Sequence, residues 1–223
     1  MISICAIAQN HQPKAIPIKN FLSKISSGKA ALIVGLSFIT SVFIVTLVDD
    51  FLLANFVVPG DTEALARDIA ANKRLFGYAV IGYLLVLVLD AIIGLALYVV
   101  LKPANENLAS VTGALRLLYA CSLLIGIFAL VFQIIDVYGY ASIKLFGYIF
   151  FALHIFVLGY SVFKSGYIPK SLGILLMFAS LTYIVFFVDL NLPGVLMASI
   201  MVLMALAELL LSIWLVLKRK KLP

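Results

Sequence analysis

Long apolar runs, separated by polar segments, repeat along almost the whole chain. They lie at 30–48, 76–101, 110–134, 145–163, 170–189 and 194–217. Each is close to the roughly 20 residues that a helix needs to cross the hydrocarbon core of a bilayer. The runs are continuous, without the alternation of a membrane-spanning strand, and backbone groups in lipid must bond within their own segment. The pattern therefore predicts an all-α, polytopic membrane helical bundle with six transmembrane helices.

The polar segments between these runs are short, with one exception at 49–75. That segment holds Val58-Pro59-Gly60-Asp61, followed by residues typical of a helix that Asp61 or Thr62 would cap. The runs divide the chain into three parts. We expect a partly disordered tail at 1–28, a six-span domain at 29–218 and a basic tail at 219–223.

Lysine and arginine gather in alternate polar segments. The N-terminal tail, the segments at 102–109 and 164–170 and the C-terminus hold most of them, whereas the intervening segments hold only Arg67, Lys73, Arg74 and Lys144. Basic residues in short loops favour the cytoplasmic side of a membrane. The distribution predicts a multi-pass protein of the cell membrane with both termini in the cytoplasm.

Composition supports the membrane assignment and limits the kinds of partner that we expect. The chain is 65% hydrophobic and 12% charged, whereas an ordinary soluble domain has about 25% charged residues. The net charge of +6 comes from clusters near the two ends, a pattern that suits anionic lipid rather than nucleic acid. We therefore expect the lipid bilayer as a partner and no nucleic acid. The oligomeric state stays open.

Several kinds of chemistry lack their sequence signatures. The two cysteines, Cys5 and Cys121, are far apart, and we predict neither a disulfide nor a metal site from them. The chain has no phosphate-binding loop, no paired zinc histidines and no nucleophile elbow. We predict no cofactor, and the absences favour a binding or transport protein over an enzyme.

Four ionisable residues interrupt the apolar runs: Asp90, Arg116, His154 and Glu208. A charge at the bilayer centre costs about 2.5–3.5 kcal/mol on insertion scales, so such residues pair with one another, contact water or serve a function. Counted along their helices, all four fall at similar depths, roughly 9–17 Å from the predicted cytoplasmic boundary. They are our candidates for a ligand-binding or proton-relay site.

The chemistry of these four residues is complementary. Arg116 offers a planar fork to a carboxylate of Asp90 or Glu208, and His154 can exchange protons near neutral pH. The same set could instead be a structural ion pair that fixes helix register. Three further residues could extend a hydrogen-bond network, and four glycines could let helices approach closely. These are Tyr83, Tyr119 and Tyr183, and Gly82, Gly94, Gly126 and Gly159.

The chain also resembles a family of bacterial and archaeal six-span membrane proteins known as domain of unknown function 4386. The resemblance covers residues 30–218. It rests on Val58-Pro59-Gly60-Asp61, Asp90 with Tyr98 and Pro103, Arg116-Leu117, His154 with Gly159-Tyr160, Lys164-Ser165-Gly166-Tyr167-Ile168-Pro169 with Gly173, and Glu208 with Trp214. It implies the fold and the membrane location, and it brings no activity.

Three functions remain open at this point. The first is binding or transport of a small or lipid-like molecule, with proton coupling. In that case Asp90 and Glu208 would accept protons or cations, Arg116 would be an anion clamp or counter-ion, and His154 would shuttle protons. The second is an enzyme acting on a lipid or prenyl substrate. The third is a structural or regulatory partner of another membrane protein, with structural ion pairs alone.

Overall fold

Helices make up the protein in a computed structural model that describes residues 17–52, 56, 62–187 and 192–223, and no strand occurs among these residues. The α-helices are α1 Pro17–Leu22, α2 Ser27–Thr46, α3 Thr62–Ala71, α4 Lys73–Leu101, α5 Glu106–Val131, α6 Val137–Ser165, α7 Lys170–Thr182 and α8 Gly194–Lys218. A π-helix, η1 Leu47–Leu52, continues α2, and 3-10 helices η3 Tyr183–Phe186 and η4 Arg219–Lys221 continue α7 and α8. The all-α prediction is confirmed.

Five of the six predicted spans are helices long and apolar enough to cross a membrane. They are Ser27–Asp49, Lys73–Leu101, Glu106–Val131, Tyr138–Ser165 and Gly194–Lys221. The run predicted at 170–189 forms a shorter apolar helix, Lys170–Val185. The protein therefore has several membrane-spanning helices. Five of the described helices qualify as spans, so the predicted count of six is not confirmed.

Some predictions fall partly outside the described residues. The predicted tail is described only from Pro17, where α1 begins, so its first 16 residues and Cys5 lie outside. The segment Val58-Pro59-Gly60-Asp61 lies outside as well. The helix predicted to follow that segment is present as α3, which starts at Thr62.

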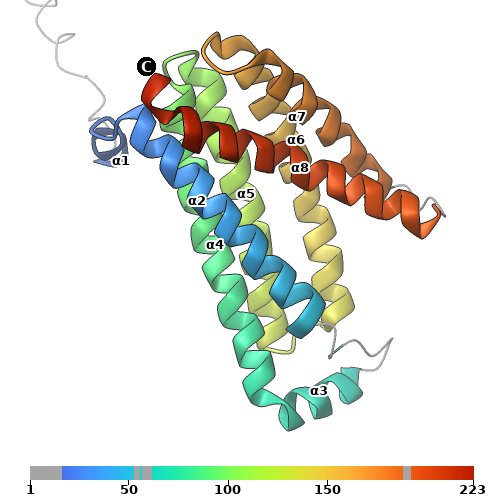
Figure 1. Ribbon diagram of the computed structural model, residues 1–223. Coiled ribbons are helices and arrows are strands. Elements are labelled where there is room, and N and C mark those ends of the chain that lie inside the picture. The colour runs from blue at the N-terminus through green and yellow to red at the C-terminus, as the bar shows by residue number, and fades with distance from the viewer. Residues whose placement is uncertain (1–16, 53–55, 57–61, 188–191) are drawn as a thin grey trace, which may run out of the picture.

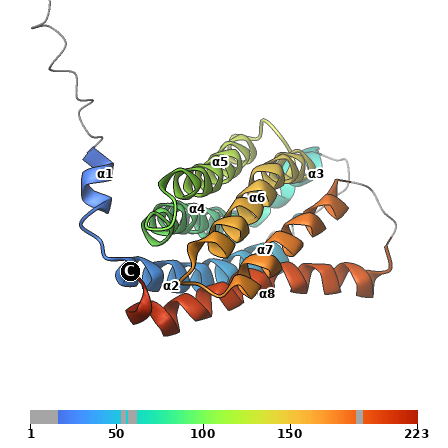
Figure 2. The ribbon, with the colours of Figure 1, turned by 90° about the horizontal axis from the view of Figure 1, so that it is seen from above.

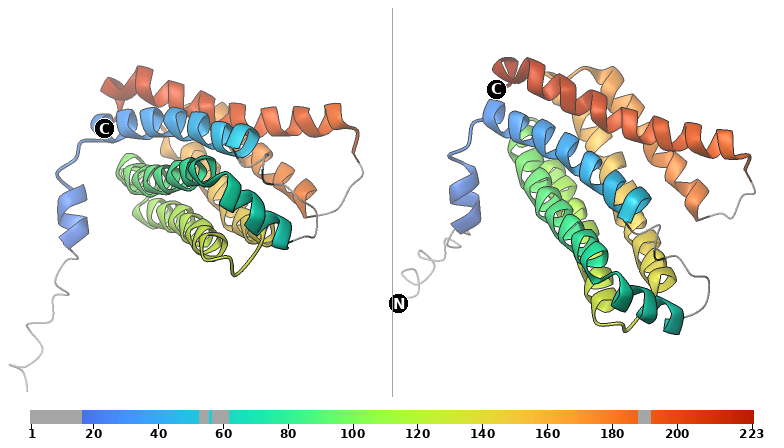
Figure 3. Two further views of the ribbon diagram at one scale, coloured as in Figure 1. Left: turned by 90° about the horizontal axis from the view of Figure 1, so that it is seen from below. Right: turned by 60° about the horizontal axis from the view of Figure 1, so that its bottom comes forward.

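The long helices α4, α5 and α6 lie side by side, and α2 packs against α4 on one face of this group (Figure 1). Helix α8 packs against α2 and α7, and α7 in turn packs against α6 (Figure 2). The C-terminus lies close to the start of α2 (Figure 1). From this shared end α2 and α8 diverge, so their far ends are well separated (Figure 3).

Glycines mark the closest approaches between these helices. A Cβ on Gly173 of α7 would lie 2.6 Å from the carbonyl oxygen of Gly159 on α6, and one on Gly159 would lie 2.7 Å from the oxygen of Gly173. A Cβ on Gly35 of α2 would lie 2.8 Å from the carbonyl oxygen of Ser212 on α8. Gly82, Gly94 and Gly126 also face neighbouring helices. All four glycines that the sequence singled out thus serve helix packing.

Two helices are longer than the apolar runs predicted. Asp136 caps α6, because its Oδ1 accepts the N–H of Gly139 at 2.7 Å, and the helix starts at Val137 rather than near 145. At the end of α2 the chain continues as the π-helix η1 instead of leaving the helix after 48. These extensions place Lys144 and Asp49 within helices, where the sequence predicted polar loops.

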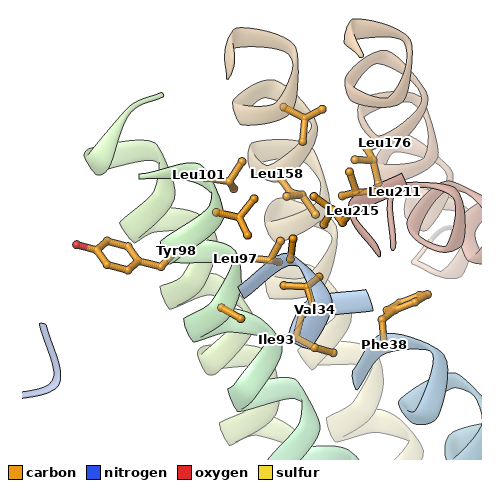
Figure 4. Packing of buried hydrophobic residues seen from close by; sticks show 14 of the residues in the cluster. Val34, Phe38, Ile93, Leu97, Tyr98, Leu101, Leu158, Leu176, Leu211 and Leu215 are labelled. Atoms are coloured by element: carbon orange, nitrogen blue, oxygen red, sulfur yellow. The ribbon is translucent and has the colours of Figure 1, made fainter. Parts of the chain in front are cut away.

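The apolar core forms two clusters with a polar layer between them. Side chains from α2, α4, α6, α7 and α8 meet in the first cluster (Figure 4). The second cluster surrounds Phe76, Tyr83 and Tyr140 near α3. On α4, Asp90 falls between the residues of the second cluster and those of the first, and Arg116 does the same on α5. Asp90 and Arg116 thus lie in the layer between the two clusters, whereas His154 and Glu208 lie beside residues of the first cluster.

Candidate functional site

Arg116 is the centre of a buried ion cluster. Its Nε and Nη2 donate to Oδ1 of Asp90 at 3.0 and 2.6 Å, and its Nη1 donates to Oε2 of Glu208 at 3.0 Å. Asp90, Arg116 and Glu208 are 2%, 3% and 8% exposed. The three residues come from α4, α5 and α8. The cluster therefore connects α8 with α4 and α5, which lie far from it in the sequence.

His154 of α6 completes the cluster as a neutral ring. Its Nδ1 lies 2.8 Å from the carbonyl oxygen of Thr112, which can only accept, so Nδ1 carries the proton. Its Nε2 faces Nη1 of Arg116 at 3.4 Å. A guanidinium has donors and no acceptor, so Nε2 presents a lone pair. This hydrogen bonding fixes His154 as an acceptor for Arg116 in the structure.

The cluster is costly to disrupt. Removing one partner of a buried ion pair costs about 3–5 kcal/mol, because the other charge is left buried and unpaired. Loss of Arg116 would leave two carboxylates unpaired, and the guanidinium also lies over the ring of Phe151 at 4.9 Å. The arrangement can therefore serve stability as well as ligand binding.

A second ion pair lies further along the same helices. Nζ of Lys144 on α6 donates to Oδ2 of Asp49 at 2.6 Å, and the hydroxyl of Tyr83 on α4 donates to Oδ1. Asp49 belongs to the π-helix η1. Such local widening of a helix is frequent at functional sites. Here it places a carboxylate where a lysine and a tyrosine from two other helices meet.

A pocket of about 310 Å³ lies between the ion cluster around Arg116 and the pair of Asp49 and Lys144. This volume is at the lower end of the range for small-molecule sites. The pocket lining includes the ion cluster around Arg116 and the pair of Asp49 and Lys144. The other lining side chains come from α2, α4, α5, α6, η3 and α8. The lining residues are Phe38, Ser41, Val42, Val45, Thr46, Asp49, Val86, Asp90, Arg116, Tyr119, Lys144, Tyr148, Phe151, Tyr183, Met201, Met204, Ala205 and Glu208.

The pocket reaches the surface between α2 and α8, where these helices diverge. Its edge includes exposed Thr46 on one side and exposed Met201 and Ala205 on the other. The buried residues of α8 begin only at Ala207, and Met201, Met204 and Ala205 before it line the pocket. Neighbouring exposed side chains such as Phe43 and Val202 are apolar. The opening therefore lies on a surface suited to lipid.

One side of the pocket is aromatic. Phe151 lies 4.6 Å from Tyr119 and 5.6 Å from Tyr183, measured between ring centroids. Tyr148 lies 5.8 Å from Tyr183 and 6.3 Å from Tyr119. We refer to Tyr119, Tyr148, Phe151 and Tyr183 as the aromatic wall. All four line the pocket beside Arg116.

The structure brings together the four residues singled out by the sequence, and it also adds others. Of the supporting tyrosines, Tyr119 and Tyr183 line the pocket and Tyr83 bonds to Asp49. Sequence reasoning missed the pair of Asp49 and Lys144, because each lies one residue outside an apolar run. The only sequence signal for Lys144 was the capping residue Asp136, which extends α6 past it.

Metal ligands do not cluster in the described part of the chain, where no three His, Cys, Asp or Glu residues come together as a metal site would require. Cys121 is exposed on α5, and the other cysteine lies outside the described residues. The titratable groups that line the pocket are Asp49, Asp90, Glu208, Arg116, Lys144 and the tyrosines of the aromatic wall.

Comparison with known proteins identifies relatives. The family model described as "Domain of unknown function (DUF4386)" matches residues 33–140 and 129–218. An "Uncharacterized protein" of Archaeoglobus fulgidus is 36% identical over 147 residues, which cover 65% of this chain and 86% of the relative. No solved structure matches the chain.

Proposed function

Because this chain belongs to the family of domain of unknown function 4386, its activity has to be inferred from the site, and we propose that it binds a small, partly apolar molecule in the pocket between α2 and α8. The observation that carries this proposal is the pocket of about 310 Å³ lined by buried ionisable groups. Ionisable side chains within a membrane are costly and are usually functional.

Access from the membrane supports a lipid-like ligand. The pocket opens between two helices at a surface with exposed apolar side chains, so a molecule dissolved in the bilayer can enter without crossing a polar loop. Its interior then offers charged groups at both ends and an aromatic wall. A ligand with an apolar body and one polar group would match this arrangement.

Transport coupled to protons is a natural extension of binding. Asp90 and Glu208 share the single guanidinium of Arg116, so a proton or a positively charged group would balance the remaining carboxylate charge. If the proton and the positively charged group exchanged at these carboxylates, movement of the ligand would be linked to movement of the proton. In this scheme His154 positions Arg116, and the carboxylates exchange the proton.

A six-span topology with both termini in the cytoplasm is part of the proposal. Helix α7 has 13 residues and the following 3-10 helix η3 has four. At about 1.5 and 2.0 Å per residue they extend about 28 Å together. That length is close to the roughly 30 Å of a hydrocarbon core. This short helix would then be the sixth crossing.

Native mass spectrometry of protein purified in mild detergent tests the binding function. Ala205→Trp should fill the mouth of the pocket, since Ala205 lines it and is exposed. Ala198→Trp is the matched control, because Ala198 is exposed two turns earlier on α8 and does not line the pocket. We expect a discrete bound mass on the wild type and on Ala198→Trp, and its loss from Ala205→Trp.

Two results would contradict the proposal. A wild type without any bound mass, or a mass that Ala205→Trp retains in full, would show that the pocket does not hold a ligand. The ion cluster would then be a structural device that fixes helix register. Thermal unfolding of each variant, measured alongside, separates loss of ligand from loss of fold.

A further inference from the structure

We propose that the ligand carries a positive charge: the pocket is a site for a hydrophobic organic cation, such as an amine or quaternary ammonium group on an apolar body. This inference rests on the proposed function, and it adds the chemical class of the ligand.

The charges that line the pocket are unequal. Three carboxylates face it, those of Asp49, Asp90 and Glu208, against two bases, Arg116 and Lys144. The excess is concentrated at the inner end, where two carboxylates meet one guanidinium. A carboxylate in a low-dielectric site favours a cation beside it strongly, since charges interact far more there than in water.

Both bases are occupied by the protein itself. Of the five N–H donors of Arg116, one at Nε and one at Nη2 are directed to Asp90, and Nη1 faces Glu208 and His154. Lys144 bonds to Asp49 at 2.6 Å. An anionic ligand would meet a carboxylate beside each of these bases: Asp90 and Glu208 beside Arg116, and Asp49 beside Lys144. Arg116 is therefore a counter-ion within the protein and a poor anion clamp.

The carboxylates keep capacity for a cation. Both bonds from Arg116 to Asp90 end on Oδ1, and the bond to Glu208 ends on Oε2. The second oxygen of each carboxylate receives none of these bonds. Because each oxygen has two lone pairs, a cationic group in the pocket would find acceptors without breaking the ion cluster.

The aromatic wall adds a second attraction for a cation. The faces of aromatic rings carry partial negative charge, and several rings around a carboxylate form the usual environment for quaternary ammonium groups. In the aromatic wall each ring contacts two of the other three. Their apolar edges also accommodate the hydrophobic part of the ligand.

A matched set of three small probes tests the charge preference. Benzyltrimethylammonium is the cation, neopentylbenzene is its uncharged carbon isostere, and phenylmethanesulfonate is an anion of similar shape. Binding is measured to protein in nanodiscs of zwitterionic lipid, and specific binding is the part that Ala205→Trp removes. We expect the cation to bind about tenfold or more tightly than the isostere, and the anion to show no specific binding.

Charge-removing variants locate the source of this preference. Glu208→Gln keeps the shape of the side chain and removes the excess charge, so the preference for the cation should fall to about threefold or less. Asp49→Asn removes a carboxylate at the other end of the pocket and should lower the preference as well. Glu106→Gln is the matched control. Glu106 is 45% exposed beside Lys102, outside the pocket lining, and its loss should leave the preference unchanged.

Each outcome decides the inference. Equal specific binding of the cation and the isostere would overturn it and leave the binding function intact. The inference would also be overturned, with the binding function intact, if native mass spectrometry showed a bound mass but the cation showed no specific binding. If neither a bound mass nor specific binding of any probe is found, the proposed function fails as well. Should Glu208→Gln fail to fold, the comparison of the three probes on the wild type still decides.

Discussion

Each residue of the loop between α6 and α7 has a distinct structural task. Ser165 Oγ accepts the N–H of Ile168 at 3.2 Å, and Gly166 ends α6 with φ of 75°, a left-handed conformation that favours glycine. Tyr167 donates its hydroxyl to the carbonyl oxygen of Val100 at 2.6 Å, and that oxygen is one of the last four of α4, which have no partner within the helix. Pro169 begins α7. This loop therefore links the ends of three helices.

Tyr167→Phe should remove the link to α4. We expect a loss of about 1–2 kcal/mol at neutral pH, because the Val100 carbonyl would lose its donor. Burial raises the pKa of Tyr167 to about 12, above the ordinary value of about 10. The stabilisation is therefore complete below about pH 10 and is lost as the pH rises through about 12. Unfolding by sodium dodecyl sulfate in mixed micelles measures the difference at each pH.

Tyr78→Phe is the control for this prediction, since Tyr78 is 61% exposed. Its stability should equal that of the wild type at neutral pH. A Tyr167→Phe protein as stable as the control would show that the hydrogen bond to Val100 contributes nothing. A difference that persists unchanged to pH 12 would contradict the titration of Tyr167.

Individual ionisable residues differ in how well sequence reveals them. Asp90, Arg116, His154 and Glu208 stood out because each lies in the middle of an apolar run, where lipid makes a charge costly. Depth along the helices suggested a shared site, but only packing shows that one guanidinium contacts the other three side chains. Asp49 and Lys144 gave no such contrast, since each lies at the polar edge of its run.

Among the elements, the short helix α7 makes a close backbone contact with its neighbour α6. It has 13 residues, and it meets α6 at the glycine pair Gly159 and Gly173, where backbone touches backbone. Small residues at such crossings allow extensive van der Waals contact, which drives helix association in membranes. The position of Tyr183, which follows α7 and belongs to the aromatic wall, therefore depends on this contact.

Gly173→Ala should weaken the contact between α6 and α7. The added Cβ would lie 2.6 Å from the oxygen of Gly159 and 2.7 Å from the nitrogen of Phe163, and neither backbone atom can move unless the helices separate. We expect a loss of about 1–3 kcal/mol, as for other overpacked sites. Gly77→Ala, with no atom within 4 Å of the new Cβ, should be neutral or slightly stabilising. Equal stability of the two variants would contradict the prediction.

The elements also show where sequence patterns lose resolution. The apolar runs located every long helix, because the requirement for about 20 apolar residues is strict. They misplaced the start of α6 and the end of α2, because Asp136 caps the first and η1 extends the second. Runs of hydrophobic residues indicate which part of a helix contacts lipid. They do not report how far a helix continues within the protein.

At the scale of the whole molecule, the number of crossings determines on which sides the termini lie. Five helices meet the length and composition of a span, and Lys170–Val185 is shorter. An even number places the two ends of the chain on the same side, and an odd number places them on opposite sides. The question therefore reduces to whether the short helix crosses.

Cysteine accessibility in intact cells decides the topology. In a protein with Cys5 and Cys121 replaced by serine, single substitutions Asn20→Cys, Leu222→Cys and Gln133→Cys are treated with a membrane-impermeant maleimide. For six spans with cytoplasmic termini, we expect labelling at position 133 alone, because it lies between α5 and α6. Labelling at 222 without labelling at 20 would show five crossings, and permeabilised cells provide the control for reactivity.

The π-helix at Leu47–Leu52 has a consequence for insertions and deletions. A π-turn holds one residue more than an α-turn, so it is the form that a single inserted residue takes inside a helix. Deleting one residue from this stretch would restore a regular helix and rotate everything beyond the deletion by about 100° around the axis. Deletion of Leu47 or Val48, which precede Asp49, would therefore turn Asp49 away from Lys144 and Tyr83. The length of the chain at this point, and not only its composition, therefore determines which side chains the pocket contains.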